Sequence, residues 1–215
     1  MRIHFSQEGE DVLLERIFFD QGFGRYVDVG AHHPFRFSNT YWAYLRGWSG
    51  INIDATPGFE TKFQRWRSRD VNVNAFISSS EGKVAFTTYP DRALNTGVAQ
   101  RVSTLSAVEG IVGSVVEVQS LRLETVLRKF LPDGAQLDLL SIDVEGNELE
   151  VLKSNDWNRF APRVVVVEVL GFTLDTVTES QAVRSLIGLG YVPVSMLYHS
   201  VILIRDPELL KKHWR

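Results

Sequence analysis

The segment RYVDVGAHHP, residues 25–34, and the segment GINIDAT, residues 50–56, decide the fold. Together they predict a short buried strand, a turn that contains Gly30, a helix, and a second buried strand that ends in Asp54. This order is the βαβ unit with which nucleotide-binding α/β folds begin. Because glycine has no Cβ, a glycine in the first turn lets the backbone approach a ligand closely. An acid at the end of the second strand is where such folds bind ribose hydroxyls.

The turn after the first strand lacks the glycines of a dinucleotide-binding fingerprint. That fingerprint is G-x-G-x-x-G, whereas Gly30 is followed by AHHP, residues 31–34. A turn with one glycine, with Asp28 two residues before it and with the ribose acid retained, favours a nucleoside that lacks a diphosphate. S-adenosylmethionine is the commonest such cofactor. A nicotinamide-dependent oxidoreductase is the alternative, and the missing glycines and Pro34 weaken it.

Several short segments follow one another along the chain: DVGAHHP (28–34), FSNT (37–40), GW (47–48), ID (53–54), ALNT (93–96) and IDVEG (142–146). In this order they resemble the FkbM-type S-adenosylmethionine-dependent methyltransferases, and the resemblance extends from Ser6 to about Val169. It implies a class I methyltransferase fold and O-methylation of a hydroxyl on a sugar, glycan or natural product. A cofactor-binding protein without turnover is a further alternative.

Length and composition predict a single domain over residues 1–215, and the resemblance implies that it is a methyltransferase domain. Of these residues, 44% are hydrophobic and 23% are charged, as in ordinary soluble domains. The net charge of −3 gives no reason to expect a nucleic-acid partner. The absence of cysteine excludes a disulfide scaffold, a thiolate zinc site and a cysteine nucleophile. The basic run from Arg65 to Arg69 is expected on a solvent-exposed helix face.

The ends and the hydropathy of the chain predict a cytoplasmic location. Residues 1–6, MRIHFS, lack the basic and then apolar run of a signal peptide. No apolar stretch approaches the roughly 18 residues that span a bilayer. We therefore expect no membrane partner, and the expected partner is a small-molecule or glycan acceptor. The oligomeric state is left open.

A leading helix is expected at about residues 7–21. Ser6 is its expected N-cap, and Glu8 and Glu10 are expected near the positive end of the helix dipole. An apolar stripe on this helix predicts that it covers one face of the sheet, with a lid over the site as the alternative.

The remaining pattern predicts a Rossmann-like three-layer α/β sandwich with a seven-stranded, mostly parallel sheet. The seven strands are expected at residues 26–29, 48–54, 71–77, 137–142, 163–167, 191–196 and 200–204. The last two form a closing antiparallel hairpin, which distinguishes class I methyltransferases from dehydrogenases. Residues 83–89 are expected to add an edge strand, and residues 114–120 form a further strand. Residues 90–113 are expected to be irregular, either a substrate-facing loop or a flexible insertion.

Acidic residues end several of the predicted strands. Asp28, Asp54, Asp143 and Glu168 fall at strand ends, and Glu145 lies just beyond. Ligands of open α/β sheets bind outside the carboxyl ends of the strands, and ionised carboxylates are costly there unless they meet a partner. The sequence therefore predicts a ligand site at this edge.

The expected cofactor assigns roles to these residues. Gly30 and Ala31 would approach the methionine part, while Asp28 would orient that loop or take the amino group. Asp54 would take the ribose hydroxyls, and Asp143 would lie beside the sulfonium. Asn74, Ala75 and Phe76 are expected to border the adenine. Asn39 is also expected at the cofactor, with helix capping as its alternative role.

Removal of a hydroxyl proton requires a base, for which the candidates are His32, His33, Asp143, Glu145 and His199. His33 is favoured because an imidazole titrates near neutrality. Its alternative is a structural role, in which the ring hydrogen-bonds the backbone of the turn. No metal is expected, although Asp143 and Glu168 on neighbouring strands would offer oxygen ligands to Mg²⁺.

Overall fold

The computed structural model of the protein describes residues 3–206 and 208–211. The predicted domain of residues 1–215 therefore includes residues 1–2, 207 and 212–215, which lie outside the described part.

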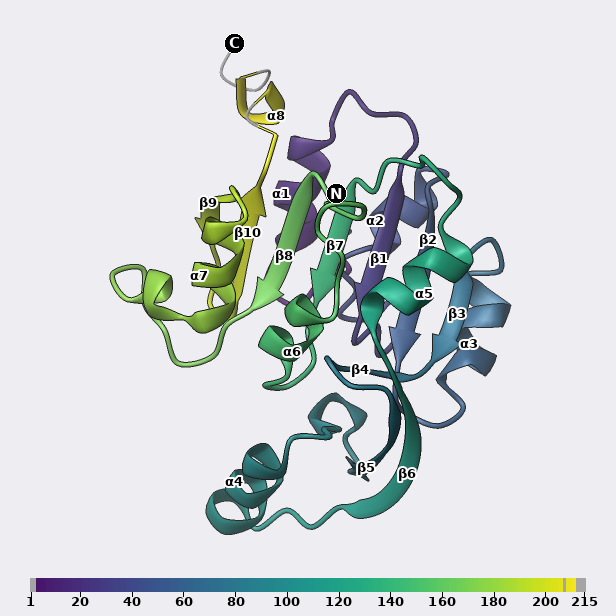
Figure 1. Cartoon of the computed structure of the whole chain (residues 1–215), viewed down its shortest axis with the longest axis vertical. Helices are drawn as coiled ribbons and strands as arrows, with labels where there is room; N and C mark the ends of the chain where they lie inside the picture. Colours follow the sequence, from purple (N-terminus) through teal and green to yellow (C-terminus); the bar gives the residue numbers. More distant parts are fainter. Residues whose placement is uncertain (1–2, 207, 212–215) are drawn as a thin grey trace.

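A seven-stranded sheet forms the centre of the molecule (Figure 1). In spatial order its strands are β3 (Val71–Asn74), β2 (Ser49–Asp54), β1 (Arg25–Val29), β7 (Leu139–Ile142), β8 (Val164–Glu168), β10 (Ser200–Ile204) and β9 (Val192–Met196). β10 runs antiparallel to both of its neighbours, and the other adjacent pairs are parallel. This order confirms the predicted class I fold and its closing hairpin.

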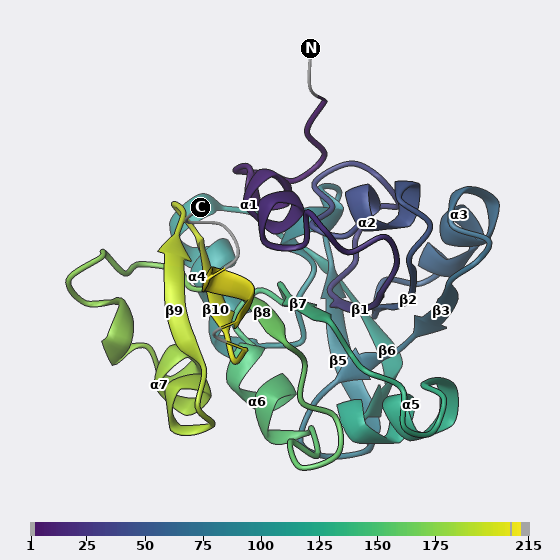
Figure 2. The same ribbon diagram turned by 90° about the horizontal axis from the view of Figure 1, so that it is seen from above.

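Helices cover both faces of this sheet and give the predicted three layers. Figure 2 shows α1 (Glu10–Ile17), α2 (Tyr41–Leu45) and α3 (Phe59–Trp66) on one face. The opposite face carries α5 (Leu123–Phe130), α6 (Glu148–Lys153) and α7 (Gln181–Gly188). Further helical elements are the short 3-10 helix η2 (Val177–Glu179) and α8 (Glu208–Lys211).

The central strands are buried on both faces, because alternate side chains point into different helical layers. In β8, Val165 and Val167 pack in the core beneath α5, α6 and α7, whereas Val164 and Val166 pack in the core beneath α1 and α2. The apolar run of β8 thus joins the two cores and holds Glu168 at its carboxyl end.

A second, three-stranded sheet corrects two expectations. Its order is β4 (Phe76–Ile77), β6 (Ser114–Leu121) and β5 (Gly82–Thr88). The single strand expected at 71–77 divides at Ala75, whose N–H donates to the Asp54 carbonyl at 3.1 Å before the chain leaves the main sheet. The expected strand at 83–89 exists as β5, but it pairs with β6 and not with an edge of the main sheet.

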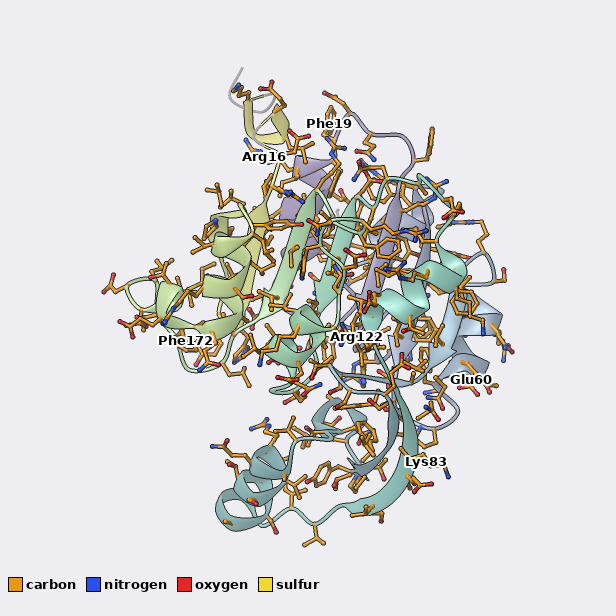
Figure 3. The ribbon with its side chains drawn as sticks, viewed as in Figure 1. Arg16, Phe19, Glu60, Lys83, Arg122 and Phe172 are labelled. Atoms are coloured by element: carbon orange, nitrogen blue, oxygen red, sulfur yellow. The ribbon has the colours of Figure 1, made fainter. Side chains whose placement is uncertain are left out.

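The second sheet lies beyond the carboxyl ends of the main strands, at the bottom of Figure 1. Arg122 lies where β6 passes into α5 (Figure 3), and its guanidinium donates to the Ser79 carbonyl at 2.7 Å. This bond ties the junction of the two sheets together.

Residues 90–113 are more ordered than expected. They contain the 3-10 helix η1 (Arg92–Leu94) and the eleven-residue helix α4 (Ala99–Glu109). Of the described side chains of α4, only Leu105 is buried. A helix with so little buried surface has no apolar stripe, which is why its sequence pattern indicated an irregular segment.

The leading helix is shorter than the expected range of 7–21 and begins after Gly9. Its core-packing role is confirmed, because Leu14 and the following Phe18 are buried against Trp42 and Trp48. Ser6 is not its N-cap, although its hydroxyl accepts the N–H of Gly9 at 3.1 Å in the turn before the helix. Within residues 3–206 and 208–211, the helices are too short and too polar to cross a membrane.

Candidate active site

A cavity of about 280 Å³ opens at the carboxyl ends of β1, β2, β7 and β8. The sequence-predicted residues that line it are Gly30, His32, Asp54, Ala75, Phe76, Asp143, Glu145, Glu168 and His199. The predicted residues that do not line it are Asp28, Ala31, His33, Asn39 and Asn74. The cavity wall also includes Gln7 from the N-terminal segment, Phe37, and Asn95 and Arg101 from the segment expected to be irregular.

Gly30 occupies a position that only glycine fits. Its φ of +83° is unfavourable for other residues, and a Cβ would lie 1.6 Å from the backbone oxygen of Asp143. The close approach that requires this glycine in the structure is therefore to the loop after β7, and its approach to a ligand stays a prediction. This contact sets Asp143 beside the end of β1.

Asp54 ends β2 and faces the cavity. Its Oδ2 accepts the backbone N–H of His32 at 2.8 Å, and its Oδ1 accepts the N–H of Thr56 at 2.7 Å. Each carboxylate oxygen keeps a second lone pair for another donor. Asn74 supports this strand end from behind, because its amide donates to the Asp54 carbonyl at 2.8 Å.

Asp28 points away from the cavity into a buried polar network. Its Oδ2 accepts the Thr40 hydroxyl at 2.6 Å, and burial raises the pKa of its carboxyl. Thr40 in turn accepts from the guanidinium of Arg67 at 2.9 Å. Of the two roles predicted for Asp28, orientation of the loop agrees with these contacts. Asn39, in the same loop, donates to Ser141 at 3.2 Å.

Arg67 corrects the expectation of a solvent-exposed basic face. Its side chain is completely buried, and it pairs with Asp70 at 2.8 Å. The same guanidinium donates to the Tyr26 hydroxyl at 2.7 Å and to Asn52 at 3.0 Å. A charge so deep in the protein is stable only because its donors are satisfied.

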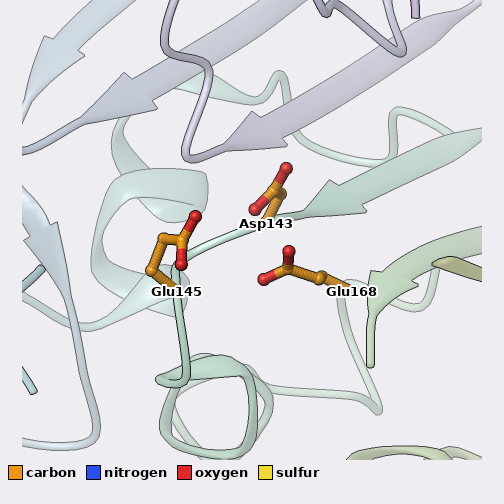
Figure 4. Close-up of side chains that lie close together, drawn as sticks. All are labelled: Asp143, Glu145 and Glu168. Carbon is orange, nitrogen blue, oxygen red and sulfur yellow. The ribbon is translucent and has the colours of Figure 1, made fainter. Parts of the chain in front are cut away.

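Three acidic side chains meet in the cavity, as Figure 4 shows: Asp143, Glu145 and Glu168. Each offers an oxygen within 4.8 Å of the others. Burial raises the pKa of Asp143 to about 7, and the charge of Glu145 adds to the shift. Burial and the charge of Asp143 raise the pKa of Glu168 to about 10. Glu168 therefore holds a proton at neutral pH, and its buried Oε2 contacts no hydrogen-bonding partner among the described residues.

Glu145 connects this acidic group to the second sheet. Its carboxylate pairs with Arg101 of α4 at 3.1 Å, and its carbonyl accepts the Thr96 hydroxyl at 3.3 Å. Burial raises the pKa of Glu145, and the charge of Arg101 opposes that shift. No local sequence pattern indicated a role for Arg101. Magnesium binding by Asp143 and Glu168 stays an alternative, for which Glu145 would be a third carboxylate ligand.

The histidines near the first turn differ in position. His33 does not line the cavity, and its Nδ1 accepts the N–H of Arg36 at 3.2 Å, which agrees with the structural alternative stated for it. His32 lines the cavity with a φ of +49°, and burial lowers the pKa of its ring. His32 is therefore a neutral group beside Asp54.

His199 lines the cavity from the turn between β9 and β10. Its Nδ1 pairs with Oε1 of Glu8, and its backbone N–H donates to Oε2 of the same residue at 2.8 Å. Glu10 accepts the Ser200 hydroxyl at 2.9 Å. These two acids make tertiary contacts, where the sequence suggested only an interaction with the helix dipole.

The N-terminal segment, residues 5–10, crosses the carboxyl edge of the main sheet. At one end the Ser38 N–H donates to the Phe5 carbonyl at 3.0 Å, and at the other end Glu8 holds His199. Gln7 lies between these anchors and faces the cavity. The segment thus forms a wall of the site, which no local sequence pattern indicated.

The sequence model of the methyltransferase FkbM domain matches residues 28–193. This chain belongs to the FkbM methyltransferase family. Methyltransferase sdnD of Sordaria araneosa is 38% identical over a stretch that covers 43% of this chain and 43% of that protein. The match thus spans less than half of that relative. A precorrin-6y C5,15-methyltransferase from Geobacter metallireducens GS-15 shares 16% identity over 91% of this chain and 87% of that chain, with a TM-score of 0.44.

Proposed function

We propose that this FkbM methyltransferase transfers a methyl group from S-adenosylmethionine to a hydroxyl oxygen of a sugar, glycan or natural product. The observation that supports the proposal most directly is the cavity at the carboxyl edge of the main sheet. It joins an acid at the end of β2, Asp54, to the three acids around the ends of β7 and β8.

The donor fits the residues that surround this cavity. Asp54 has lone pairs left for the ribose hydroxyls, and Ala75 and Phe76 offer apolar surface for the adenine. Burial and neighbouring acids raise the pKa of Asp143 to about 7, so a cation beside this carboxyl would stabilise its ionised form. The sulfonium is such a cation, and it supplies an activated methyl group. The chain then has to position the acceptor and remove its proton.

The first test is calorimetric titration of the protein with S-adenosylmethionine and, separately, with NAD. Binding of the methyl donor with no heat from NAD is expected. Asp54→Asn should weaken donor binding about 5- to 150-fold, equivalent to ~1–3 kcal/mol for a lost hydrogen-bonded charge. Asp133→Asn, at a side chain that is 91% exposed, is the matched control. Tight NAD binding without donor binding would refute the proposal.

Turnover is tested by incubation with methyl-labelled donor and a set of hydroxylated acceptors. Label in an alkali-stable methyl ether is expected, because O-methylation of an alcohol produces an ether. Donor binding with label that never leaves the donor would support the alternative of a cofactor-binding protein without turnover.

A further inference from the structure

The pair formed by Glu8 and His199 has the geometry of an oriented base. One carboxylate of Glu8 holds both the ring Nδ1 and the backbone N–H of His199, so the ring is fixed in direction. A carboxylate at Nδ1 selects the tautomer in which that nitrogen is protonated, which leaves Nε2 with a free lone pair. Among the described residues, Nε2 has no hydrogen-bonding partner. The side chain of His199 is 36% exposed and that of Glu8 is 14% exposed. The pair is therefore partly shielded from solvent, and His199 lines the cavity.

His199 lies on the side of the cavity that carries Glu145 and Glu168. Its carbonyl accepts the Val169 N–H at 2.6 Å, directly after Glu168, and the residue that follows it, Ser200, pairs with Glu168 across the strands. The ring is also near enough to Glu145 for a protonated imidazole to lower the pKa of that carboxyl. The ring therefore lies near the acids that the proposed function places at the sulfonium.

The other candidate bases are less suited to an acceptor proton. His32 lies on the opposite side, where its backbone is bound to the ribose acid Asp54. His33 is turned to the backbone of its own loop. Glu145 is engaged by Arg101, and Glu168 is already protonated at neutral pH.

We infer that His199 is the general base that removes the acceptor hydroxyl proton, and that Glu8 is the residue that positions it. This inference rests on the proposed function. As the acceptor oxygen forms a bond to the methyl carbon, the carbon–sulfur bond breaks and its electron pair stays on sulfur. The hydroxyl proton passes to Nε2 of His199, so the products are a methyl ether, S-adenosylhomocysteine and an imidazolium that returns its proton to water.

The groups that face the His199 ring are Glu8 from the N-terminal segment, Glu145 from the loop after β7, and Tyr198, whose ring centroid lies 4.4 Å away. Within the part of the chain that the structure describes, only Glu8 bonds the ring itself. Loss of the Glu8 carboxylate should therefore reduce the preference of His199 for the tautomer that is protonated at Nδ1.

The test that needs no acceptor is nitrogen NMR of the full chain labelled at histidine. At a pH where the ring is neutral, His199 is expected with a protonated Nδ1 and an unprotonated Nε2. Addition of S-adenosylmethionine should shift the Nε2 resonance, and S-adenosylhomocysteine, which lacks the methyl group and the charge, should shift it less. Glu8→Gln should mix the tautomers. The opposite tautomer in the parent protein, or an Nε2 resonance that ignores the donor, would overturn the inference.

Kinetics and binding separate this inference from the proposed function. His199→Gln should bind S-adenosylmethionine within about threefold of the parent protein, while single-turnover methylation of a methyl glycoside falls about 10²- to 10⁴-fold, the range for a lost general base. His4→Gln, at an exposed histidine just before the N-terminal segment, is the control and should change neither donor binding nor the methylation rate. Donor binding with an undiminished rate in His199→Gln refutes the base. Failure of the parent protein to bind the donor refutes the proposed function instead.

Discussion

Replacement of Glu168 by glutamine should stabilise the ligand-free protein, and the gain should grow with pH. Glu168 is mostly buried beside Asp143, and its pKa is raised from 4.5 to about 10. An acid whose pKa is raised on folding binds its proton more tightly in the folded state. The free energy of unfolding therefore falls as pH rises above the unfolded value, and the fall continues toward the folded value. The glutamine side chain does not ionise, so the stability of the variant lacks this pH dependence.

The magnitude follows from the pH interval. For one proton that is bound in the folded state and lost in the unfolded state, the free energy of unfolding falls by about 1.4 kcal/mol per pH unit. The interval from pH 4.5 to pH 7 therefore sets an upper limit of about 3.4 kcal/mol on the stability gained by the variant. Sharing of the proton with Asp143 and partial contact with solvent reduce this, and we expect about 2 kcal/mol at pH 7. At pH 4.5, glutamine and the protonated acid should be nearly equal in stability.

The assay is urea unfolding at pH 5, 6, 7 and 8, monitored by the fluorescence of the buried Trp42 and Trp48. Glu179→Gln, at an exposed acid outside the cavity, is the matched control and should follow the parent protein. Equal pH slopes for Glu168→Gln and the parent protein would show that the acid ionises normally. A variant that is less stable than the parent at pH 8 would contradict the reasoning outright.

Three further outcomes are expected. Arg67→Met should lower the free energy of unfolding, measured by urea unfolding, by about 3–5 kcal/mol, because it leaves the buried Asp70 without its charged partner. Arg65→Met, at an exposed position, should stay within about 0.5 kcal/mol of the parent protein. A small loss of stability in Arg67→Met would contradict the burial of that network. Gly30→Ala should abolish folding or donor binding, since its Cβ would lie 1.6 Å from a backbone oxygen. Gly22→Ala, with open space around it, should be tolerated. Circular dichroism reports loss of folding, and calorimetry reports loss of donor binding. Titration with Mg²⁺ should give no saturable heat, because a bound proton already offsets the repulsion among the acids; saturable heat that disappears in Glu145→Gln would establish a metal site.

Local patterns were sufficient to predict the main sheet. The buried strands around Asp28 and Ile142 and the closing hairpin follow from short apolar runs between turn residues, which depend on neighbours in sequence. The division of the third strand at Ala75 was missed, because it depends on a hydrogen bond to Asp54 and on pairing of Ile77 with Leu121. Such pairing across a long loop leaves no periodic signal.

The acids of the site were predictable for a similar reason. Parallel strands end at one edge, so Asp54, Asp143 and Glu168 had to meet there. The burial of Arg67 was not predictable, because the surrounding charges suggested a solvated helix. The contact between Glu8 and His199 joins residues 191 positions apart, and no property of either neighbourhood indicates it.

The wall built by residues 5–10 has a consequence for comparing members of this family. The region shared with the family, residues 28–193, contains Gly30, Asp54 and the three acids, but it contains neither Gln7 nor the pair of Glu8 and His199. Under the proposed function, two homologues alike throughout the shared region would hold the donor in the same way and could still present different chemistry to the acceptor. Chimeras that exchange only the flanking segments offer a route to new acceptor preferences on an unchanged donor site.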